Sequence, residues 1–219
     1  MFSFGIPNIV EANIWIDILT ARIEELKLNE TRMKEQINEL EHLVTIDPLT
    51  CVYNRRFLDN YLQQMQSSGM EQERRSATNK FSILLIDIDD FKIINDNNTH
   101  VVGDGVLRYT AGTISSALRK GLDICGRYGG DEFLVVTWSI AIIDAYNLAL
   151  RIKDKIKKSN GQNITVSIGV AEYWNGESVE ELISRASSAV NEKHVRGRDS
   201  VYVNVFYDKA IGAYINYKL

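Results

Sequence analysis

Two β-prone segments separated by a glycine pair are the feature that most limits how this chain can fold. Residues 122–128 and 133–137 are apolar, and Gly129 and Gly130 stand between them. Glycine takes positive φ without steric cost, so we predict that the pair forms the tip of a β-hairpin with a left-handed backbone. Asp131 and Glu132 follow at the mouth of this turn. They are either solvated turn residues or oxygen ligands for a hard divalent cation.

A heptad repeat occupies the N-terminal part of the chain, where apolar residues alternate three and four positions apart for about five heptads. The a positions are mostly β-branched and the d positions are Leu, Met or Ala, which favours a parallel two-stranded coiled coil. A long amphipathic helix folded back on its own domain is the alternative. Pro48 ends the helical pattern, so we predict a coiled-coil helix in residues 1–46 and a second domain in residues 47–219. The repeat consists of Ile9, Ala12, Ile16, Leu19, Ile23, Leu26, Met33, Ile37, Leu40 and Val44, and Glu30 takes the remaining a position.

The second domain alternates strands and helices, which predicts an α/β (α+β) fold. A short helix over 54–66 and a surface loop over 67–80 come first, and residues 206–219 form an additional tail. The first six of the remaining elements match a βαββαβ plan. We predict strands over 81–87, 122–128, 132–137, 164–171 and 201–205, and helices over 102–118, 140–158 and 178–194.

Composition excludes several classes of protein. Hydrophobic residues make up 45% and charged residues 25% of the 219-residue chain, as in globular proteins. A net charge of −4 argues against a nucleic-acid polymer as partner but permits a mononucleotide. No segment has the apolar length of a membrane span, so we expect a cytoplasmic protein. Cys51 and Cys125 lack metal-ligand spacing, and we predict that both are reduced and buried.

Three carboxylates follow the buried strand over 81–87, at Asp87, Asp89 and Asp90. Such neighbours repel one another unless a cation lies between them. Asp87 and Asp131 are expected to face one point from two strands, which suits magnesium with a triphosphate. Alternatively, one of the three acids only caps the helix that follows.

Two further groups suit a guanine nucleotide. Asn95 can donate to the guanine O6 or N7, and Asp104 can accept from N1 and N2, although each residue taken alone is more often a cap or turn residue. A cationic cluster lies at the end of the third long helix. It is either a phosphate-binding site or a favourable placement of positive charge against the helix dipole. The cluster comprises Lys193, His194, Arg196 and Arg198.

These motifs together resemble the GGDEF family of diguanylate cyclases from Asp47 to about Val205. The resemblance implies a fold like that of nucleotidyl cyclases and polymerase palms, with a central, mainly antiparallel sheet flanked by helices. It rests on five blocks in order: Asp47-Pro48-Leu49-Thr50 with Asn54-Arg55-Arg56, Asp87-Ile88-Asp89 with Phe91-Lys92 and Asn95-Asp96, His100 with Gly103-Asp104, Gly129-Gly130-Asp131-Glu132-Phe133, and Ser167-Ile168-Gly169-Val170-Ala171.

The resemblance also implies roles for individual residues. Asp87, Asp131 and the carbonyl of Ile88 correspond to the ligands of two magnesium or manganese ions. Glu132 is the second catalytic carboxylate, and Lys92 neutralises developing phosphate charge. The remaining positions are substrate contacts: Phe91, Asn95, Asp104, Gly129, Gly130, Lys193 and Arg198.

Departures from the family pattern affect the phosphate grip and two turns. The family's phosphate-binding lysine falls on His194, with Lys193 one position earlier, and a shift of one residue turns a helical side chain by about 100°. Thr99 and Cys51 each replace a glycine, which is expected to strain their turns. Lys120 and Asp123 occupy a degenerate form of the family's inhibitory site. Lysine lacks the bidentate fork of arginine, so we predict weak or absent product inhibition.

The sequence therefore predicts a diguanylate cyclase that condenses two GTP into cyclic di-GMP and pyrophosphate across a homodimer, under the control of an upstream sensor or regulatory partner. The first alternative is a catalytically weak domain that senses GTP or cyclic di-GMP. The second is a dimeric scaffold that binds neither nucleotide.

Overall fold

The computed structural model describes residues 9–43, 45–72, 81–97, 100–138, 140–158, 164–174, 176–204, 207–208 and 213–214. The predicted turn residue Thr99, the strand residue Val205 and most of the tail therefore lie outside the described residues. The chain divides into two compact units, residues 1–44 and 45–219.

The first unit contains one long helix, α1 (Ile9–Leu43). The large apolar side chains of α1 from Ile14 to Leu40 are half exposed or more, including Ile16, Leu19 and Ile23 of the heptad repeat at 58%, 58% and 52%. No helix in the described part of the chain is both long and apolar enough to cross a membrane.

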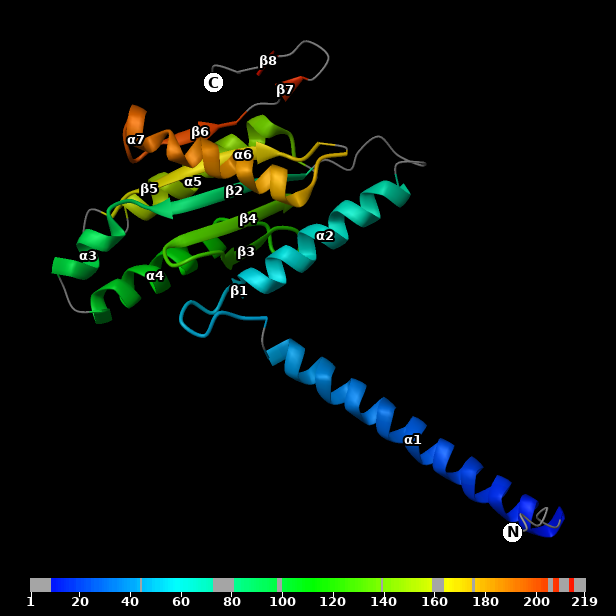
Figure 1. Cartoon of the computed structure of the whole chain (residues 1–219). Coiled ribbons are helices and arrows are strands. Elements are labelled where there is room, and N and C mark those ends of the chain that lie inside the picture. Colours follow the sequence, from blue (N-terminus) through cyan, green and yellow to red (C-terminus); the bar gives the residue numbers. More distant parts are fainter. Residues whose placement is uncertain are drawn as a thin grey trace, which may run out of the picture. The chain divides into compact units, whose positions relative to one another are not determined.

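The second unit is built on a six-stranded sheet with the order β1-β3-β4-β2-β5-β6 (Figure 1). The four central strands pair antiparallel, and the edge strands pair parallel to their neighbours. This confirms the predicted mainly antiparallel sheet and the βαββαβ order. The strands are β1 (Tyr53–Asn54), β2 (Phe81–Ile88), β3 (Ile124–Arg127), β4 (Glu132–Trp138), β5 (Val166–Glu172) and β6 (Val201–Val203).

Helices cover both faces of the sheet, so β2 is buried on both sides (Figure 1). Successive side chains of a strand point to opposite faces, and Leu84 and Ile86 lie in one core with residues of α4 and α5, whereas Ile83 and Leu85 lie in a second core with residues of α2 and α6. This explains the uninterrupted apolar run. The helices are α2 (Arg55–Gln72), α3 (Phe91–Asn97), α4 (His100–Ser115), α5 (Ile142–Lys158), α6 (Val179–Asn191) and α7 (Lys193–Arg196).

Several predicted boundaries were wrong. Helix α2 continues through residues 67–72, which were assigned to a loop, and the side chain of Gln66 holds it by donating to the Glu177 carbonyl at 2.7 Å. The helix predicted over 178–194 is divided at Glu192 into α6 and α7. Strand β1 and helix α3 were not predicted. In the tail, β7 (Tyr207–Asp208) pairs antiparallel with β8 (Ala213–Tyr214).

The prediction for the cysteines was right for one of them. Cys125 is buried, and burial raises the pKa of its thiol to about 12. Cys51 is exposed, contrary to expectation, and lies in the turn that begins at Asp47, where its N–H donates to the Asp47 carbonyl at 2.9 Å. Its φ of 59° lies in the left-handed region that favours glycine, as the departure from the family's glycine indicated.

Candidate active site

Three acids from two adjacent strands meet at one end of the sheet. Asp87 lies at the end of β2, directly opposite Glu132, the first residue of β4. Asp131 precedes Glu132, and its carbonyl oxygen accepts from the Ile88 N–H at 3.4 Å. The antiparallel register therefore brings together the acids that the sequence places 44 to 45 residues apart.

Burial and mutual repulsion raise the pKa of two of these acids. For Asp87, burial is the largest cause, the charges of Asp131 and Asp89 add to it, and Lys193 opposes it. For Glu132, burial again leads, followed by the charges of Asp87 and Asp131. A group of acids that destabilise one another in this way gains stability from a bound cation.

Lys193 is the cation that contacts this group. Its Nζ forms an ion pair with Asp87 Oδ1, and only 9% of the lysine side chain and 18% of the aspartate side chain are exposed. Lys193 is the first residue of α7, whereas the next residue, His194, is exposed. Lys193, which lies one position before the place of the family's phosphate-binding lysine, therefore contacts Asp87.

The acids offer the type of ligand atom that a divalent metal ion prefers, but too few side chains to hold the ion alone. Carboxylate and carbonyl oxygens are the ligands of magnesium, and Asp87, Asp131 and the Ile88 carbonyl supply only oxygen. Among the residues that the structure describes, no group of three or more Asp, Glu, His or Cys side chains is arranged to hold a metal. A metal here would need oxygens from the backbone and from the substrate as well.

The glycine pair adjoins the acids, but its backbone differs from the prediction. The predicted hairpin is present, since β3 pairs antiparallel with β4 on either side of the glycines, but neither Gly129 nor Gly130 takes the positive φ that was expected. A Cβ on Gly129 would come within 2.6 Å of Glu132 Oε2. Gly129 is therefore required for the close approach of the Glu132 carboxylate.

Arg127 fixes the hairpin, a role that the sequence analysis missed. Its guanidinium donates to the Gly130 carbonyl at 2.7 Å and 3.1 Å and lies 3.4 Å from Asp47 Oδ2. The other Asp47 oxygen accepts from the Thr50 N–H and hydroxyl at 2.9 Å and 2.6 Å. Burial alone would raise the pKa of Asp47, but the hydrogen bonds from Thr50 and the charge of Arg127 together lower it. The turn after α1 is thus bonded to the hairpin of the candidate site.

Asn95 and Asp104, the predicted guanine contacts, lie on adjacent helices α3 and α4. The carboxamide of Asn95 occupies the space that a side chain at Gly103 would need. Asn95 Oδ1 is buried and has no hydrogen-bond partner among the described residues. Asp104 is partly exposed, with Arg108 3.8 Å away. Both side chains therefore keep unused hydrogen-bonding capacity.

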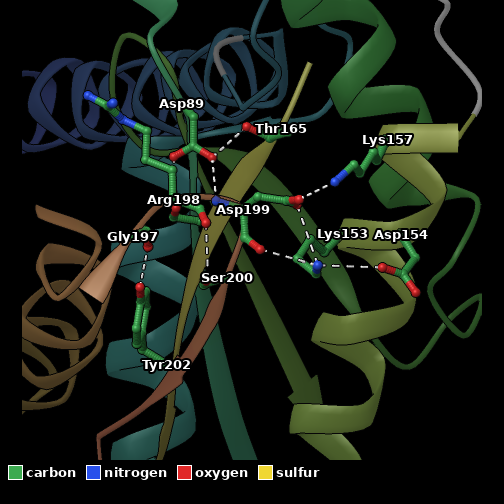
Figure 2. A network of polar contacts seen from close by, with 11 residues as sticks. Asp89, Lys153, Asp154, Lys157, Thr165, Gly197, Arg198, Asp199, Ser200 and Tyr202 are labelled. Atoms are coloured by element: carbon green, nitrogen blue, oxygen red, sulfur yellow. Dashed lines mark hydrogen bonds and ion pairs between the residues drawn. The ribbon is translucent and has the colours of Figure 1, made fainter. Parts of the chain in front are cut away.

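Arg198 lies in a turn that buried polar contacts hold in place (Figure 2). Asp89 is 4% exposed and accepts from the hydroxyls of Thr165 and Ser167 at 2.8 Å and 2.7 Å and from the Asp199 N–H at 3.0 Å. Lys153 and Lys157 of α5 both pair with the Asp199 carboxylate. The contacts of Asp89 are therefore with the start of β5 and with the turn at Asp199, and none of them is the helix cap that the sequence offered as an alternative.

The guanidinium of Arg198 is half exposed and contacts Asp90 Oδ1 at 2.9 Å. Asp90 itself has a positive φ of 54°. The turn and the end of β2 are thus linked at two points, through Asp89 and through Asp90.

Asp123, which was predicted to belong to a degenerate inhibitory site, is paired with a neighbouring arginine. Asp123 is buried, and its two oxygens accept from Arg119 Nε at 3.0 Å and Nη2 at 2.7 Å. Backbone N–H groups of Arg119 and Trp138 also donate to it. Burial opposes these contacts, but together they lower the pKa of Asp123. Lys120 is exposed.

Comparison with known proteins identifies the family. The family model described as "Diguanylate cyclase, GGDEF domain" matches residues 44–200, most of the chain. The chain belongs to the GGDEF family of diguanylate cyclases. The response regulator PleD of Caulobacter vibrioides is 35% identical over 212 residues, which cover 91% of this chain and 45% of PleD. The chain spans about half the length of the curated relatives it matches.

Solved GGDEF structures share the fold. The coiled coil and GGDEF domain of DgcB from Caulobacter crescentus, in complex with c-di-GMP, aligns with a TM-score of 0.69 and 28% identity and covers 84% of this chain and 98% of that chain. The diguanylate cyclase SiaD of Pseudomonas aeruginosa, in complex with its activator SiaC, aligns with a TM-score of 0.67 and 27% identity and covers 89% of this chain and 76% of that chain.

In this GGDEF domain, the structure brings together Asp87, Asp131, Glu132 and Lys193. It does not join every predicted residue to them, since Lys92 is exposed on α3 and none of its described contacts reaches the acids. The sequence analysis missed the contacts of Asp47 and Asp89, which it named only as motif residues, and it missed Arg127 altogether. A signal was present for Asp47, which opens the first motif block, whereas only the fold shows that Arg127 meets it.

Proposed function

We propose that this GGDEF domain is a diguanylate cyclase that condenses two GTP into cyclic di-GMP with release of pyrophosphate. The observation that carries the proposal is the meeting of Asp87, Asp131 and Glu132 where β2 ends and β4 begins, beside the glycine pair Gly129 and Gly130. The family model and the curated diguanylate cyclases that match most of this chain support it.

Within this proposal, Asp87, Asp131 and the Ile88 carbonyl hold two magnesium or manganese ions. Bound metal lowers the pKa of the attacking 3′-hydroxyl and neutralises charge on the α-phosphate. Glu132, whose pKa burial and the neighbouring acids raise, is suited to hold a proton near the reacting oxygens. Lys92, Lys193 and Arg198 supply positive charge to the phosphates.

The base is read at α3 and α4. The carboxamide of Asn95 donates to guanine O6 or N7, and the Asp104 carboxylate accepts from guanine N1 and N2. The carbonyl oxygen of Asn95 is buried without a partner, so this side chain has hydrogen-bonding capacity that the described residues do not use. Phe91, Gly129 and Gly130 are the remaining proposed substrate contacts.

Each subunit supplies one GTP, so the two sites must meet. The exposed seam of α1 supports a parallel coiled coil as the dimerising element, since about five heptads of half-exposed apolar residues are costly in water. We expect Ile23→Asp to produce monomers in sedimentation experiments. Leu28→Asp, at an equally exposed site outside the seam, should leave the dimer intact. Equal effects of the two substitutions would contradict the pairing.

Control by an upstream sensor or regulatory partner belongs to the same proposal. The solved structure of the diguanylate cyclase SiaD in complex with its activator SiaC supports the proposal of a regulatory partner. The direct bonding of the turn after α1 to the hairpin through Asp47 and Arg127 provides a physical connection for such control.

Incubation of the purified chain with GTP and magnesium, followed by chromatographic separation of the nucleotides, tests the activity. We expect cyclic di-GMP from the wild type and none from Asp131→Asn. If the wild type yields no cyclic dinucleotide at any protein concentration, the proposal is wrong.

A catalytically weak domain that senses GTP or cyclic di-GMP is the second candidate. The ion pair of Lys193 with Asp87 favours it, because that pair occupies a proposed metal ligand. Tight nucleotide binding without turnover distinguishes this candidate from the first.

A further inference from the structure

The ion pair between Lys193 and Asp87 is unusual in its setting. Both partners are largely buried, and the charge of the lysine ammonium acts on Asp87 and on Glu132. A buried acid cluster without a cation is strongly unfavourable, and Lys193 supplies part of the missing charge from within the chain.

The place of Lys193 in the fold makes this contact specific to its position. Helix α6 ends at Asn191, and α7 begins at Lys193 after a single residue, Glu192. The side chains at 194, 195 and 196 are exposed, so Lys193 alone of the α7 residues is turned inward. A lysine at position 194 would not make the same contact, because adjacent helical side chains diverge by about 100°.

We propose that Lys193 is an internal counter-ion of Asp87 which a divalent cation must displace, and that the displaced ammonium then becomes a contact for the substrate triphosphate. The inference rests on the proposed function in taking Asp87 as a metal ligand.

The reason for displacement is electrostatic. Lys193 Nζ forms its ion pair with Asp87 Oδ1, an oxygen of the proposed metal ligand. A metal ion bound to that oxygen would therefore be repelled by the ammonium. A divalent ion brings twice the charge of the ammonium to three carboxylates and wins the site when its concentration is sufficient. Lysine has a flexible stem and three donors, which suits it to leave one anion for another.

Two consequences follow from this exchange. Without metal, the site keeps its shape and is protected against binding other cations. With metal and nucleotide bound, Lys193 makes the phosphate contact that the family makes from the position of His194. The exposed His194 therefore does not cost the site its phosphate contact.

Metal binding in the absence of nucleotide tests the proposal. The full-length chain is titrated with Mn²⁺ and free Mn²⁺ is followed by electron paramagnetic resonance, for the wild type and for Lys193→Gln, Lys193→Arg, Arg196→Gln and Asp87→Asn. Arg196→Gln is the matched control, because it removes one positive charge from the same short helix at an exposed side chain that pairs with Glu192 at 3.0 Å.

We expect Lys193→Gln to bind Mn²⁺ roughly tenfold more tightly than the wild type, since one competing charge is gone. Arg196→Gln and Lys193→Arg should remain close to the wild type, and Asp87→Asn should lose the site. Equal affinity for Lys193→Gln and Arg196→Gln, weaker binding by Lys193→Gln, or Mn²⁺ binding that Asp87→Asn leaves intact would each overturn the proposal.

The claim that the displaced Lys193 ammonium contacts the triphosphate is tested by measuring GTP affinity with Ca²⁺ in place of Mg²⁺. We expect Lys193→Gln to bind GTP several-fold more weakly despite its tighter metal site, and unchanged GTP affinity would overturn that claim. Because neither measurement reads turnover, the outcomes separate the two claims. A wild type that makes no cyclic di-GMP but shows the expected Mn²⁺ series refutes only the proposed function.

Discussion

Asp87 and Asp89 are two residues apart at the end of one strand, yet they should respond in opposite ways to removal of their carboxylates. Asp89 is 4% exposed and accepts three hydrogen bonds, two from Thr165 and Asp199 (Figure 2) and one from Ser167. Asp87 has a pKa that burial and its acidic neighbours raise, and Lys193 is the partner that opposes this. We therefore expect Asp89→Ala to destabilise the fold and Asp87→Ala to spare it.

The magnitude for Asp89 follows from its hydrogen bonds. Each bond to a charged group contributes about 1.5–3 kcal/mol, and because such bonds are not additive we take the lower values, which give roughly 4 kcal/mol for Asp89→Ala. For a unit of this size that corresponds to a fall of about 8–16 °C in melting temperature. Asp87→Ala removes one ion pair but also relieves repulsion among the acids, so its change in unfolding free energy should stay within about 1 kcal/mol.

Urea denaturation followed by far-UV circular dichroism measures both variants against the wild type. Both should lose cyclic di-GMP synthesis, Asp89→Ala because the turn carrying Arg198 is released and Asp87→Ala because a proposed metal ligand is gone. If Asp89→Ala unfolds at the wild-type urea concentration, or if Asp87→Ala is destabilised as much as Asp89→Ala, the division into a structural and a functional acid is refuted.

Three further predictions follow from other contacts. Gly103→Ala should weaken GTP binding roughly tenfold by displacing the Asn95 carboxamide, whereas Gly105→Ala, with nothing within 4 Å of the added methyl group, should bind as the wild type does in calorimetry with Ca²⁺; equal affinities would contradict this role of Asn95. Asp123 has a lowered pKa in the folded state, so its stabilising effect is present above the unfolded value of about 3.9 and is lost as the pH falls through the folded value. The urea midpoint of Asp123→Asn should therefore lie below that of the wild type at pH 7, with a difference that shrinks towards pH 3, and a constant difference would count against the sign. Lys120→Ala should leave a cyclic di-GMP titration unchanged, with weak inhibition in both proteins, and tight binding that the substitution abolishes would disprove the degenerate inhibitory site.

The fold was largely predictable because its strands follow simple rules. The apolar run at 81–87 and the paired segments around the glycines carry the periodicity of buried and hairpin strands, and both were found where predicted. Helix ends were less predictable. The polar residues after Gln66 and the chain around Glu192 have no strong local preference, so tertiary contacts decide where α2 and α6 end.

Residue types and spacing sufficed to select the acids of the candidate site, but not to assign them their partners. Asp87 and Asp89 look equivalent in the sequence, and only the neighbouring strand β5 and the turn at Asp199 supply the donors that make Asp89 structural. Lys193 was predicted as a phosphate contact with its register in doubt. Its contact with Asp87 depends on the break at Glu192, for which the sequence holds no clear signal.

The condensation of two GTP is tested most directly by following the products over time by liquid chromatography and mass spectrometry, at several concentrations of the full-length chain with magnesium. The account predicts cyclic di-GMP as the final product, with two pyrophosphate molecules released for each one formed and a rate per subunit that rises with protein concentration until the dimer is saturated. GTP that remains unconverted at every concentration, or that is hydrolysed to GDP without any cyclic dinucleotide, would contradict it.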